Sequence, residues 1–340
     1  MKIAFINDTF LQGRGADVVM YELAKRLGKK HEVFILAGET NIPEKNFKFV
    51  KLNLQKLFTG KVTDFGYFKK MRILQDQFKE LDKRFSFDKV LVFHGGLSSA
   101  FRKNEKINYI WLGSPPTKNI FRKLASKYFQ RGMRENKIIT ISNYLAGELK
   151  NMGARKVKVI LLGVSEEFKP IKKDGAYMLY VGRLEKHKRV DQLIKLSKKI
   201  NFPLRIIGYG LEEKKLKSLT ERINAPVGFL GRVSREDLVR NYQSCSFFVS
   251  ASEWEGFGLI FVEAGACGKP SIGYNKGSIP EVIINNKTGF VVNNFEEFVE
   301  KATLLKMDKT RRKKMGDGAR KYSVKFDWER VSKEYERELK

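Results

Sequence analysis

The sequence predicts an α/β protein made of two Rossmann-like domains, each with a parallel sheet. Short apolar runs alternate with segments of helical periodicity along the whole chain, which is typical of parallel strands joined by helices. The length of 340 residues exceeds one typical domain and fits two. Apolar residues make up 42% of the chain, so two hydrophobic cores can be filled.

Two series of strands are expected. The first consists of Lys2–Ile6, Glu32–Leu36, Phe47–Leu52, Lys89–Phe93, Tyr109–Leu112, Lys137–Ile141 and Val157–Leu161. The second starts at Met178 and continues with Leu204–Ile207, Gly228–Leu230, Phe247–Val249, Ser271–Gly273 and Phe290–Val292. Pro170 and Gly175 break the pattern between them. We therefore expect domains over residues 1–165 and 166–325, followed by a last helix, 326–340, that no strand follows.

A glycine-spaced turn between a strand and a helix carries two carboxylates, Glu255 and Glu263. Gly256 and Gly258 allow a close approach of the backbone, and the start of a helix attracts phosphate. The free N–H groups expected at this start are those of Phe257, Gly258 and Leu259. Because carboxylates repel phosphate, hydroxyls are the expected partners of the glutamates. The turn thus suits a sugar joined to a nucleoside diphosphate, although solvated glutamates at an ordinary helix start would look the same.

Two cations occupy a similar strand end earlier in the chain. Arg183 and Lys188 bracket the loop between the strand that ends at Val181 and the next helix. A diphosphate requires such a pairing, since arginine offers a planar fork and lysine a compact charge. Taken singly, either residue is an ordinary surface cation.

Four groups of residues share their order and spacing with a known family. They are Gly182-Arg183-Leu184 with Lys188, Ile207-Gly208-Tyr209-Gly210, Glu255 with Glu263, and Pro280-Glu281-Val282 followed by Thr288-Gly289-Phe290. Together they resemble the retaining glycosyltransferases of the GT-B fold, in the large family four group, over nearly the whole chain. The resemblance implies two Rossmann-like domains that face each other across a cleft, with the last helix returning to the first domain.

The resemblance also implies roles for single residues. Glu255 would contact the transferred sugar, Glu263 the ribose of the donor, and Arg183 with Lys188 the diphosphate. The donor base would be read near Val233. His94 stands at the end of a buried strand, where the family places a histidine against the sugar, although a lone histidine is more often structural. Gly13 and Gly15 could approach the donor phosphates, or form a plain flexible loop.

The chemistry implied by the resemblance is hexose transfer with retention at the anomeric carbon. We favour front-face attack assisted by the leaving phosphate, with Glu255 only binding a hydroxyl. Neither a metal nor another cofactor is expected, because Arg183, Lys188 and the helix amides balance the phosphate charge. Three departures concern loop geometry and acceptor contacts: Arg189 stands where the family often has glycine, Arg14 separates two usually adjacent glycines, and Leu162-Gly-Val-Ser165 replaces the usual Asn-Gly-Val-Asp.

The net charge of +29 exceeds what a diphosphate site requires. Residues 1–165 hold 32 Lys and Arg against 14 Asp and Glu, a net charge of +18. Basic segments with interleaved apolar residues, at 56–61, 67–72 and 120–129, suit an anionic membrane surface. A lysine-rich proteome would give the same excess, and no nucleic-acid recognition module is visible. We therefore expect a lipid-linked or glycan acceptor, and no specific nucleic acid.

The start of the chain and its cysteines bear on location. Met1–Ile6 enters an apolar strand directly, and no apolar run approaches the roughly 18 residues that a spanning helix needs. Cys245 and Cys267 lie in apolar surroundings and are expected as buried thiols. A cytoplasmic protein, attached peripherally to the inner face of the membrane, fits these features. The alternatives are a catalytically silent protein of the same fold that binds sugar nucleotides or polyanions, and an epimerase of that fold.

Overall fold

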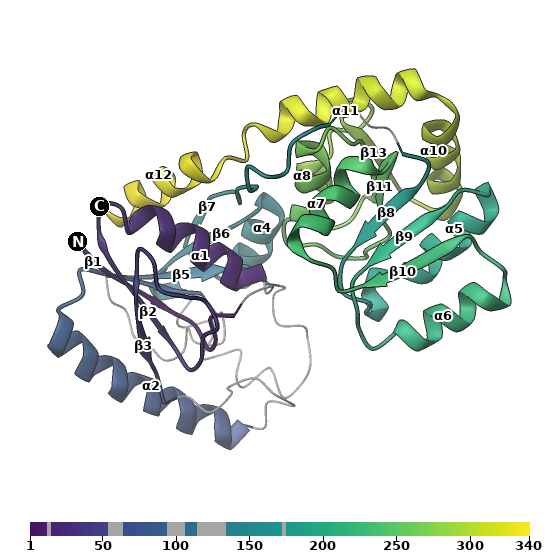
Figure 1. Cartoon of the computed structure of the whole chain (residues 1–340). Helices are drawn as coiled ribbons and strands as arrows, with labels where there is room; N and C mark the ends of the chain where they lie inside the picture. The colour runs from purple at the N-terminus through teal and green to yellow at the C-terminus, as the bar shows by residue number, and fades with distance from the viewer. Residues whose placement is uncertain (12–14, 54–63, 94–105, 114–133, 172–174) are drawn as a thin grey trace. The chain divides into compact units, whose positions relative to one another are not determined.

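The computed structural model describes residues 1–11, 15–53, 64–93, 106–113, 134–171 and 175–340 (Figure 1). Two compact units make up this chain. Unit 1 contains Met1–Leu161 and Trp328–Lys340, and unit 2 contains Leu162–Asp327. The basic segments 56–61 and 120–129 lie outside the described residues, as do the side chains of residues 67–70.

Unit 1 is built on a seven-stranded parallel sheet with the strand order β3-β2-β1-β4-β5-β6-β7. Its strands are β1 (Lys2–Ile6), β2 (Glu32–Ala37), β3 (Lys48–Lys51), β4 (Lys89–Val92), β5 (Ile107–Trp111), β6 (Lys137–Thr140) and β7 (Lys156–Val159). All seven strands expected from the sequence are therefore confirmed, with ends shifted by up to two residues. The order reverses between β1 and β4, which pair directly.

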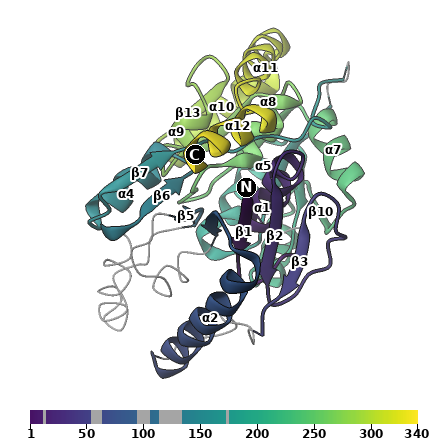
Figure 2. The same ribbon diagram turned by 90° about the vertical axis from the view of Figure 1, so that its left-hand side faces the viewer.

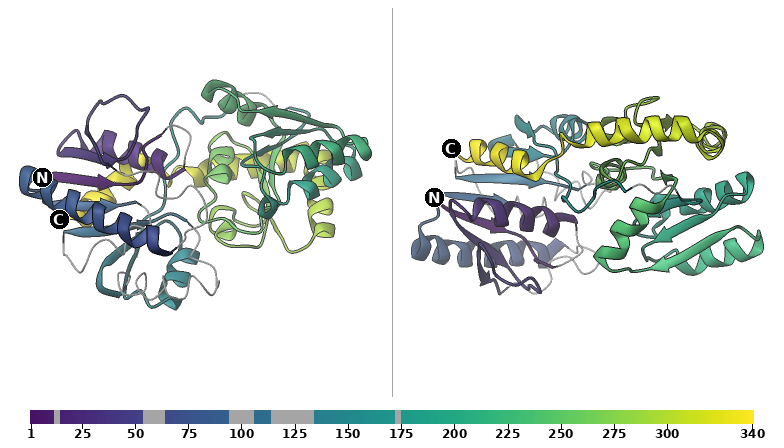
Figure 3. Two further views of the ribbon diagram at one scale, coloured as in Figure 1. Left: turned by 90° about the horizontal axis from the view of Figure 1, so that it is seen from below. Right: turned by 45° about the horizontal axis from the view of Figure 1, so that its top comes forward.

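Helices cover both faces of this sheet. The helices of unit 1 among the described residues are α1 (Gly15–Leu27), α2 (Asp64–Phe85), α4 (Asn143–Asn151) and α12 (Trp328–Leu339). Side chains of α2 and α4, including Leu74 and Leu149, share one core with Ala4 and Ile6 of β1. Because side chains alternate along a strand, Ile3 and Phe5 point to the other face, where α1 and α12 lie (Figure 3).

Helix α12 packs on α1 beside the first strands (Figure 2). Trp328 is almost fully buried, and the Arg26 guanidinium lies 6.0 Å from its ring centre. Arg26 Nε also pairs with Glu329 Oε1 at 2.9 Å. At the other end of α12, Glu338 pairs with Lys137 of β6 and, at 3.3 Å, with Lys158 of β7. The last helix is thus held in unit 1 by an aromatic anchor and ion pairs at both ends.

Replacing Glu338 by glutamine is expected to weaken unit 1 modestly and only above acidic pH. The hydrogen bond from Lys137 lowers the pKa of Glu338, so the pair stabilises the fold above the unfolded pKa, and this contribution is lost as the pH falls. We expect Glu338→Gln to cost about 0.5–1 kcal/mol at pH 7 and almost nothing at pH 3. Urea unfolding at both pH values measures this. The same loss from Glu334→Gln, whose pair with Arg330 is confined to α12, would contradict a specific tie to the sheet.

Unit 2 contains a six-stranded parallel sheet with the order β10-β9-β8-β11-β12-β13. The strands are β8 (Met178–Val181), β9 (Leu204–Ile207), β10 (Val227–Gly231), β11 (Phe247–Ser250), β12 (Ser271–Tyr274) and β13 (Gly289–Val292). The second predicted series is confirmed in full. The order reverses between β8 and β11, which lie side by side although two strands separate them in sequence.

The helices of unit 2 are α5 (Val190–Ile200), α6 (Glu213–Arg222), α7 (Arg235–Ser244), α8 (Leu259–Ala266), α9 (Ile279–Val282), α10 (Phe295–Met307) and α11 (Lys309–Ser323). Residues of α5, α6 and α10 share one core with Met178 and Tyr180 of β8. Helix α8 packs against α7 and α11. After β8 the chain continues into α5, and after β11 it continues into α8. These two helices belong to different helical layers, so the chain leaves the two neighbouring strands in different directions.

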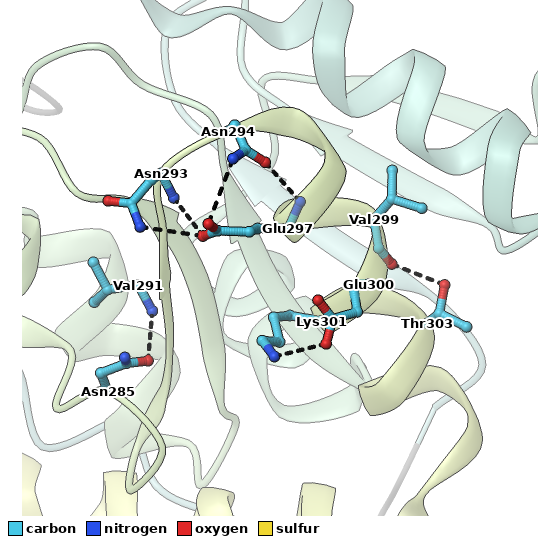
Figure 4. A network of polar contacts seen from close by, with 9 residues as sticks. All are labelled: Asn285, Val291, Asn293, Asn294, Glu297, Val299, Glu300, Lys301 and Thr303. Atoms are coloured by element: carbon cyan, nitrogen blue, oxygen red, sulfur yellow. Dashed lines mark hydrogen bonds and ion pairs between the residues drawn. The ribbon is translucent and has the colours of Figure 1, made fainter.

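Side-chain hydrogen bonds fix the start of α10 directly after the edge strand β13 (Figure 4). Asn294 accepts a hydrogen bond from the Glu297 amide at 2.8 Å, and the Glu297 carboxylate accepts one from the Asn293 amide at 2.8 Å. The first bond satisfies a backbone N–H group that a helix start leaves free, and the second ties the residue before the N-cap to the first turn of the helix. Asn285 Oδ1 likewise accepts from the Val291 amide of β13 at 3.1 Å.

Both cysteines are free and buried, as the sequence predicts. Across the described ranges, we find no helix with the length and apolar character needed to span a bilayer.

Candidate active site

The crevice expected in unit 2 lies where its strand order reverses. In open parallel sheets, the loops after two neighbouring strands diverge at such a point, and ligands bind there, beyond the carboxyl ends of the strands. Here the strands are β8 and β11. The loop after β8 contains Arg183 and Lys188, and the loop after β11 contains Glu255. The topology therefore brings together the two motifs that the sequence places about seventy residues apart.

Three glycines form a row at the carboxyl ends of β8, β9 and β10. The Gly208 amide donates to Gly231 O at 2.9 Å, and the Gly182 amide donates to Ile207 O at 3.0 Å. Gly208 has a φ of 137°, and a Cβ there would stand 1.8 Å from Gly182 O. Only glycine fits such a position, so this part of the sheet edge presents backbone rather than side chains.

Lys188 and Glu255 meet at the reversal point. Their Nζ and Oε1 atoms lie 2.7 Å apart, and the side chains are only 14% and 12% exposed. Lys188 ends a short 3₁₀ helix, η2 (Lys186–Lys188). The Glu253 amide donates to His187 O at 2.9 Å and joins the two loops directly. Because little water reaches this ion pair, the electrostatic attraction between its partners is stronger than in a surface pair. Either side chain could also bind a ligand of opposite charge or a hydroxyl.

The backbone of Glu255 is fixed by the loop after β12. Glu255 O accepts hydrogen bonds from the Ser278 amide at 3.2 Å and from Ser278 Oγ at 2.9 Å. Gly277 has a φ of 57°, and a Cβ there would lie 2.7 Å from Glu255 O. These contacts hold the carboxylate-bearing turn against a third loop. Ser278 was not predicted from the sequence, because nothing local links it to Glu255.

Arg183 lies nearer the surface than Lys188. Its guanidinium is paired with Glu185 at 2.6 Å, with 68% of the side chain exposed. His187 Nδ1 lies 3.4 Å from the other oxygen of Glu185. Burial and the Lys188 ammonium lower the pKa of His187, which therefore stays neutral at pH 7. Glu185, which the sequence analysis missed, is thus the carboxylate that balances Arg183 in the free protein.

Arg189, the departure from the family's glycine, has a left-handed backbone with φ 49° and ψ 39°. This conformation costs an L-residue about 1–2 kcal/mol, which explains why glycine is usual there. The Arg189 side chain pairs with Glu253 at 2.7 Å and with Asp191 at 3.7 Å. Its ion pair with Glu253 adds a third link between the loops after β8 and β11, besides the Lys188–Glu255 pair and the bond from the Glu253 amide.

Glu263 lies on α8 and has contacts separate from the Lys188–Glu255 pair. Its Oε2 accepts a hydrogen bond from the Tyr242 hydroxyl of α7 at 2.8 Å. Burial raises the pKa of Glu263 to about 7, against the opposing effects of Arg235 and of the Tyr242 hydrogen bond. The two glutamates of the motif therefore have different partners. Tyr242 was not predicted, since a tyrosine within an amphipathic helix reads as a core residue.

Of the other residues predicted for the site, some lie in unit 2 and some in unit 1. Gly258 caps α8 with a φ of 86°, Leu259 is the first helical residue, and the Phe257 ring is buried against Phe326. Only the backbone of Phe257 can therefore contact a ligand, as the sequence analysis proposed. Gly256 precedes this turn, and Val233 is half-buried just before α7. In unit 1, Gly15 begins α1, whereas Gly13 and His94 lie outside the described residues.

The arrangement suits recognition of a diphosphate that carries hydroxyl-bearing groups. One nearly buried and one exposed cation, Lys188 and Arg183, stand beside a helix start and a row of backbone glycines. Carboxylates on either side of that helix start accept hydrogen bonds from hydroxyls. Within the described ranges, no group of three His, Cys, Asp or Glu side chains is arranged to hold a metal ion.

Comparisons with known proteins identify a family that this chain resembles. Residues 164–322 match the family model of glycosyl transferases group 1. An uncharacterized glycosyltransferase of Methanocaldococcus jannaschii is 33% identical over 222 residues, which are 63% of each chain. The O-antigen chain mannosyltransferase B of Escherichia coli is 37% identical over 116 residues, 32% of this chain and 30% of that protein. The chain thus spans less than two thirds of these relatives.

Solved structures match over the full length. Sucrose-phosphate synthase from Thermosynechococcus elongatus has a TM-score of 0.85 at 18% identity, with 99% of this chain and 97% of that chain covered. Anabaena HepE in complex with UDP-glucose has a TM-score of 0.81 at 16% identity, with 100% and 99% covered. These matches confirm the GT-B fold predicted from the sequence.

Proposed function

Because this chain belongs to the glycosyl transferases group 1 family through its second unit, we propose that it is a retaining glycosyltransferase. It moves a hexose from a nucleoside-diphosphate sugar to an acceptor. The observation that carries the proposal is the Lys188–Glu255 pair, nearly buried at the strand-order reversal of unit 2. A nearly buried cation at that position can bind the diphosphate. The Glu255 carboxylate that pairs with it in the free protein can then accept a hydrogen bond from a sugar hydroxyl.

The donor would be bound in three parts. Lys188 and Arg183 neutralise the diphosphate together with the amides at the start of α8. Glu255 holds the transferred sugar, Glu263 the ribose, and the backbone near Val233 the base. As the bond to the sugar breaks, negative charge grows on the leaving phosphate, and these fixed cations stabilise it. No metal is required in this scheme, so transfer should persist in the presence of EDTA.

The leaving phosphate also supports retention. In front-face attack, the acceptor approaches the anomeric carbon on the side from which the diphosphate departs, and a phosphate oxygen takes the acceptor's proton. In this arrangement Glu255 binds a sugar hydroxyl and does not serve as a nucleophile. His94, Gly13 and Gly15 are proposed to contact the sugar, the acceptor or the phosphates.

The acceptor is proposed to be a lipid-linked glycan at an anionic membrane surface on the cytoplasmic side. The support is the charge of +18 in residues 1–165, the part expected to bind the acceptor. The names of similar proteins mention O-antigen chains, capsular polysaccharide biosynthesis and lipopolysaccharide biosynthesis. These names support a glycan acceptor. Each basic residue near such a surface adds about 1 kcal/mol of attraction.

Nucleoside diphosphates are expected to stabilise the protein against heat in a base-specific way. Uridine diphosphate is the first probe, because HepE was crystallised with UDP and with UDP-glucose, and guanosine and adenosine diphosphates complete the panel. A ligand at 100 times its Kd adds about 2.7 kcal/mol of stability. We expect the shift to be lost in Arg183→Ala and Glu263→Ala.

Two further outcomes separate the alternatives. Binding of one nucleotide without any sugar transfer to lipid extracts would favour the catalytically silent protein of the same fold. No shift with any nucleoside diphosphate or its sugars would contradict the transferase.

A further inference from the structure

Glu263 is the one charged residue in an otherwise apolar helix, α8. The residue is only 8% exposed, and the residues on either side of it are buried. A carboxylate removed from water is costly unless a donor faces it. The donor that faces Glu263 therefore determines where the carboxylate points and whether it carries a charge.

Tyr242 supplies this donor from α7. Its hydroxyl donates to Glu263 Oε2 at 2.8 Å, and the residue is fully buried. Two aromatic contacts fix the ring: Phe168 packs edge-on at 5.5 Å between centroids, and Phe248 is stacked at 5.6 Å. Because the ring is held on both sides, the position of the hydroxyl oxygen is determined by packing and does not depend on a ligand.

The charges around this pair favour a tyrosine that donates and a glutamate that titrates near neutrality. Burial and the adjacent carboxylate raise the pKa of Tyr242 well above its usual value, so the hydroxyl keeps its proton. Burial raises the pKa of Glu263 to about 7, while Arg235 and the Tyr242 hydrogen bond act in the opposite direction. The other ionisable groups near α8 include Glu167, Cys245, Cys267, Lys269 and Arg320.

Arg235, at the start of α7, pairs with Glu167 at 2.5 Å and covers the Phe168 ring at 4.6 Å. Its charge lowers the pKa of Glu263 without a direct contact, and Glu167 opposes this effect. The Tyr242 hydroxyl favours the ionised glutamate by direct contact, through its 2.8 Å hydrogen bond.

We propose that Tyr242 is a positioning residue for donor recognition, which orients the Glu263 carboxylate and favours its ionised form so that it accepts hydrogen bonds from vicinal hydroxyls of the donor. This inference rests on the proposed function. An ionised carboxylate accepts hydrogen bonds more strongly than a protonated one. Donor affinity should therefore rise with pH as Glu263 loses its proton, and removal of the tyrosine hydroxyl should move this rise to higher pH.

The test is the affinity for uridine diphosphate, or for whichever nucleoside diphosphate binds, measured by calorimetry from pH 5.5 to 9 on the whole protein. We expect Tyr242→Phe to shift the midpoint upward by about one pH unit, since a hydrogen bond to a charged group is worth that much. At pH 6.5 the variant should bind several-fold more weakly, and at pH 9 the two affinities should converge. Glu263→Gln gives the baseline profile due to the nucleotide itself.

Tyr177→Phe is the matched control. Its hydroxyl also bonds to α7, but to the backbone carbonyl of Asn241 at 3.0 Å, so its loss should leave the midpoint unchanged. A folded Tyr242→Phe protein with the wild-type midpoint would overturn the inference and leave the proposed function intact. Absence of nucleotide binding by the wild type would overturn both.

A second measurement covers the case in which Tyr242→Phe does not fold. Wild-type protein labelled with 3-fluorotyrosine should show one ¹⁹F resonance that titrates near neutral pH and moves when the nucleotide binds. This titration should vanish in Glu263→Gln, whose folded structure keeps the tyrosine. If no tyrosine resonance depends on Glu263 in this way, Tyr242 does not sense or set its charge, and the inference fails.

Discussion

Replacing Lys188 by methionine is expected to lower the rate of sugar transfer by about 100- to 1000-fold, the usual cost of removing one preorganised group that stabilises developing charge. Lys188 Nζ lies 2.7 Å from Glu255 with little exposure to water. Water therefore screens the Lys188 charge poorly, and this charge would interact strongly with the leaving diphosphate. Steady-state kinetics with saturating donor should show the loss mainly in kcat, because the negative charge grows as the bond breaks.

Lys186→Met is the control for this prediction. Lys186 lies two residues earlier in η2, carries the same charge and is exposed. It should retain close to wild-type kcat, since an exposed cation interacts weakly. A Lys188→Met enzyme within about threefold of wild type would show that the pair is structural. Thermal unfolding of both variants checks that a lost rate does not reflect a lost fold.

Replacing Gly208 by alanine is expected to destabilise unit 2 by about 3 kcal/mol or more, through two independent effects. The backbone has a φ of 137°, a region that residues with a Cβ avoid. The new Cβ would also stand 1.8 Å from Gly182 O, which belongs to the neighbouring strand end and cannot rotate away. Hydrogen exchange of β8 and β9 in increasing urea measures the effect locally, because two units can unfold separately.

Gly228→Ala is the matched substitution. Gly228 lies in β10 of the same sheet and lacks a positive φ, and a Cβ added there would meet no heavy atom within 4 Å. Its change should stay within about 0.5 kcal/mol of wild type. Equal stability of the two variants would mean that the close approach of Gly208 to Gly182 does not constrain this sheet edge.

The sheets could be predicted from the sequence because most of their inner strands are buried on both faces. Runs such as Lys2–Ile6 and Leu204–Ile207 are apolar almost throughout, so they stand out from the helical segments around them. The ends of the strands are predicted less exactly. The strand predicted at Tyr109–Leu112, for example, corresponds to β5, which spans Ile107–Trp111. Strand ends depend on pairing with neighbours, and a local apolar pattern does not contain that information.

The residues of the candidate site could be proposed from the sequence, and their contacts could not. Glycines, cations and carboxylates at strand ends identified Arg183, Lys188, Glu255 and Glu263, because the chemistry of a phosphate and a hydroxyl limits the residue types. Their partners are set by tertiary packing. The Lys188–Glu255 pair spans 67 residues and depends on β8 lying beside β11. The Tyr242 contact depends on the packing of α7 against α8.

The most direct test of sugar transfer with retention is the anomeric configuration of the product. The purified protein would be incubated with the nucleotide sugar chosen by the binding panel and with a membrane lipid extract. The glycosylated lipid would then be isolated, and its one-bond C1–H1 coupling measured by NMR. We predict the same anomeric configuration as in the donor sugar. An inverted product, or release of free sugar without any glycosylated acceptor, would contradict a retaining glycosyltransferase.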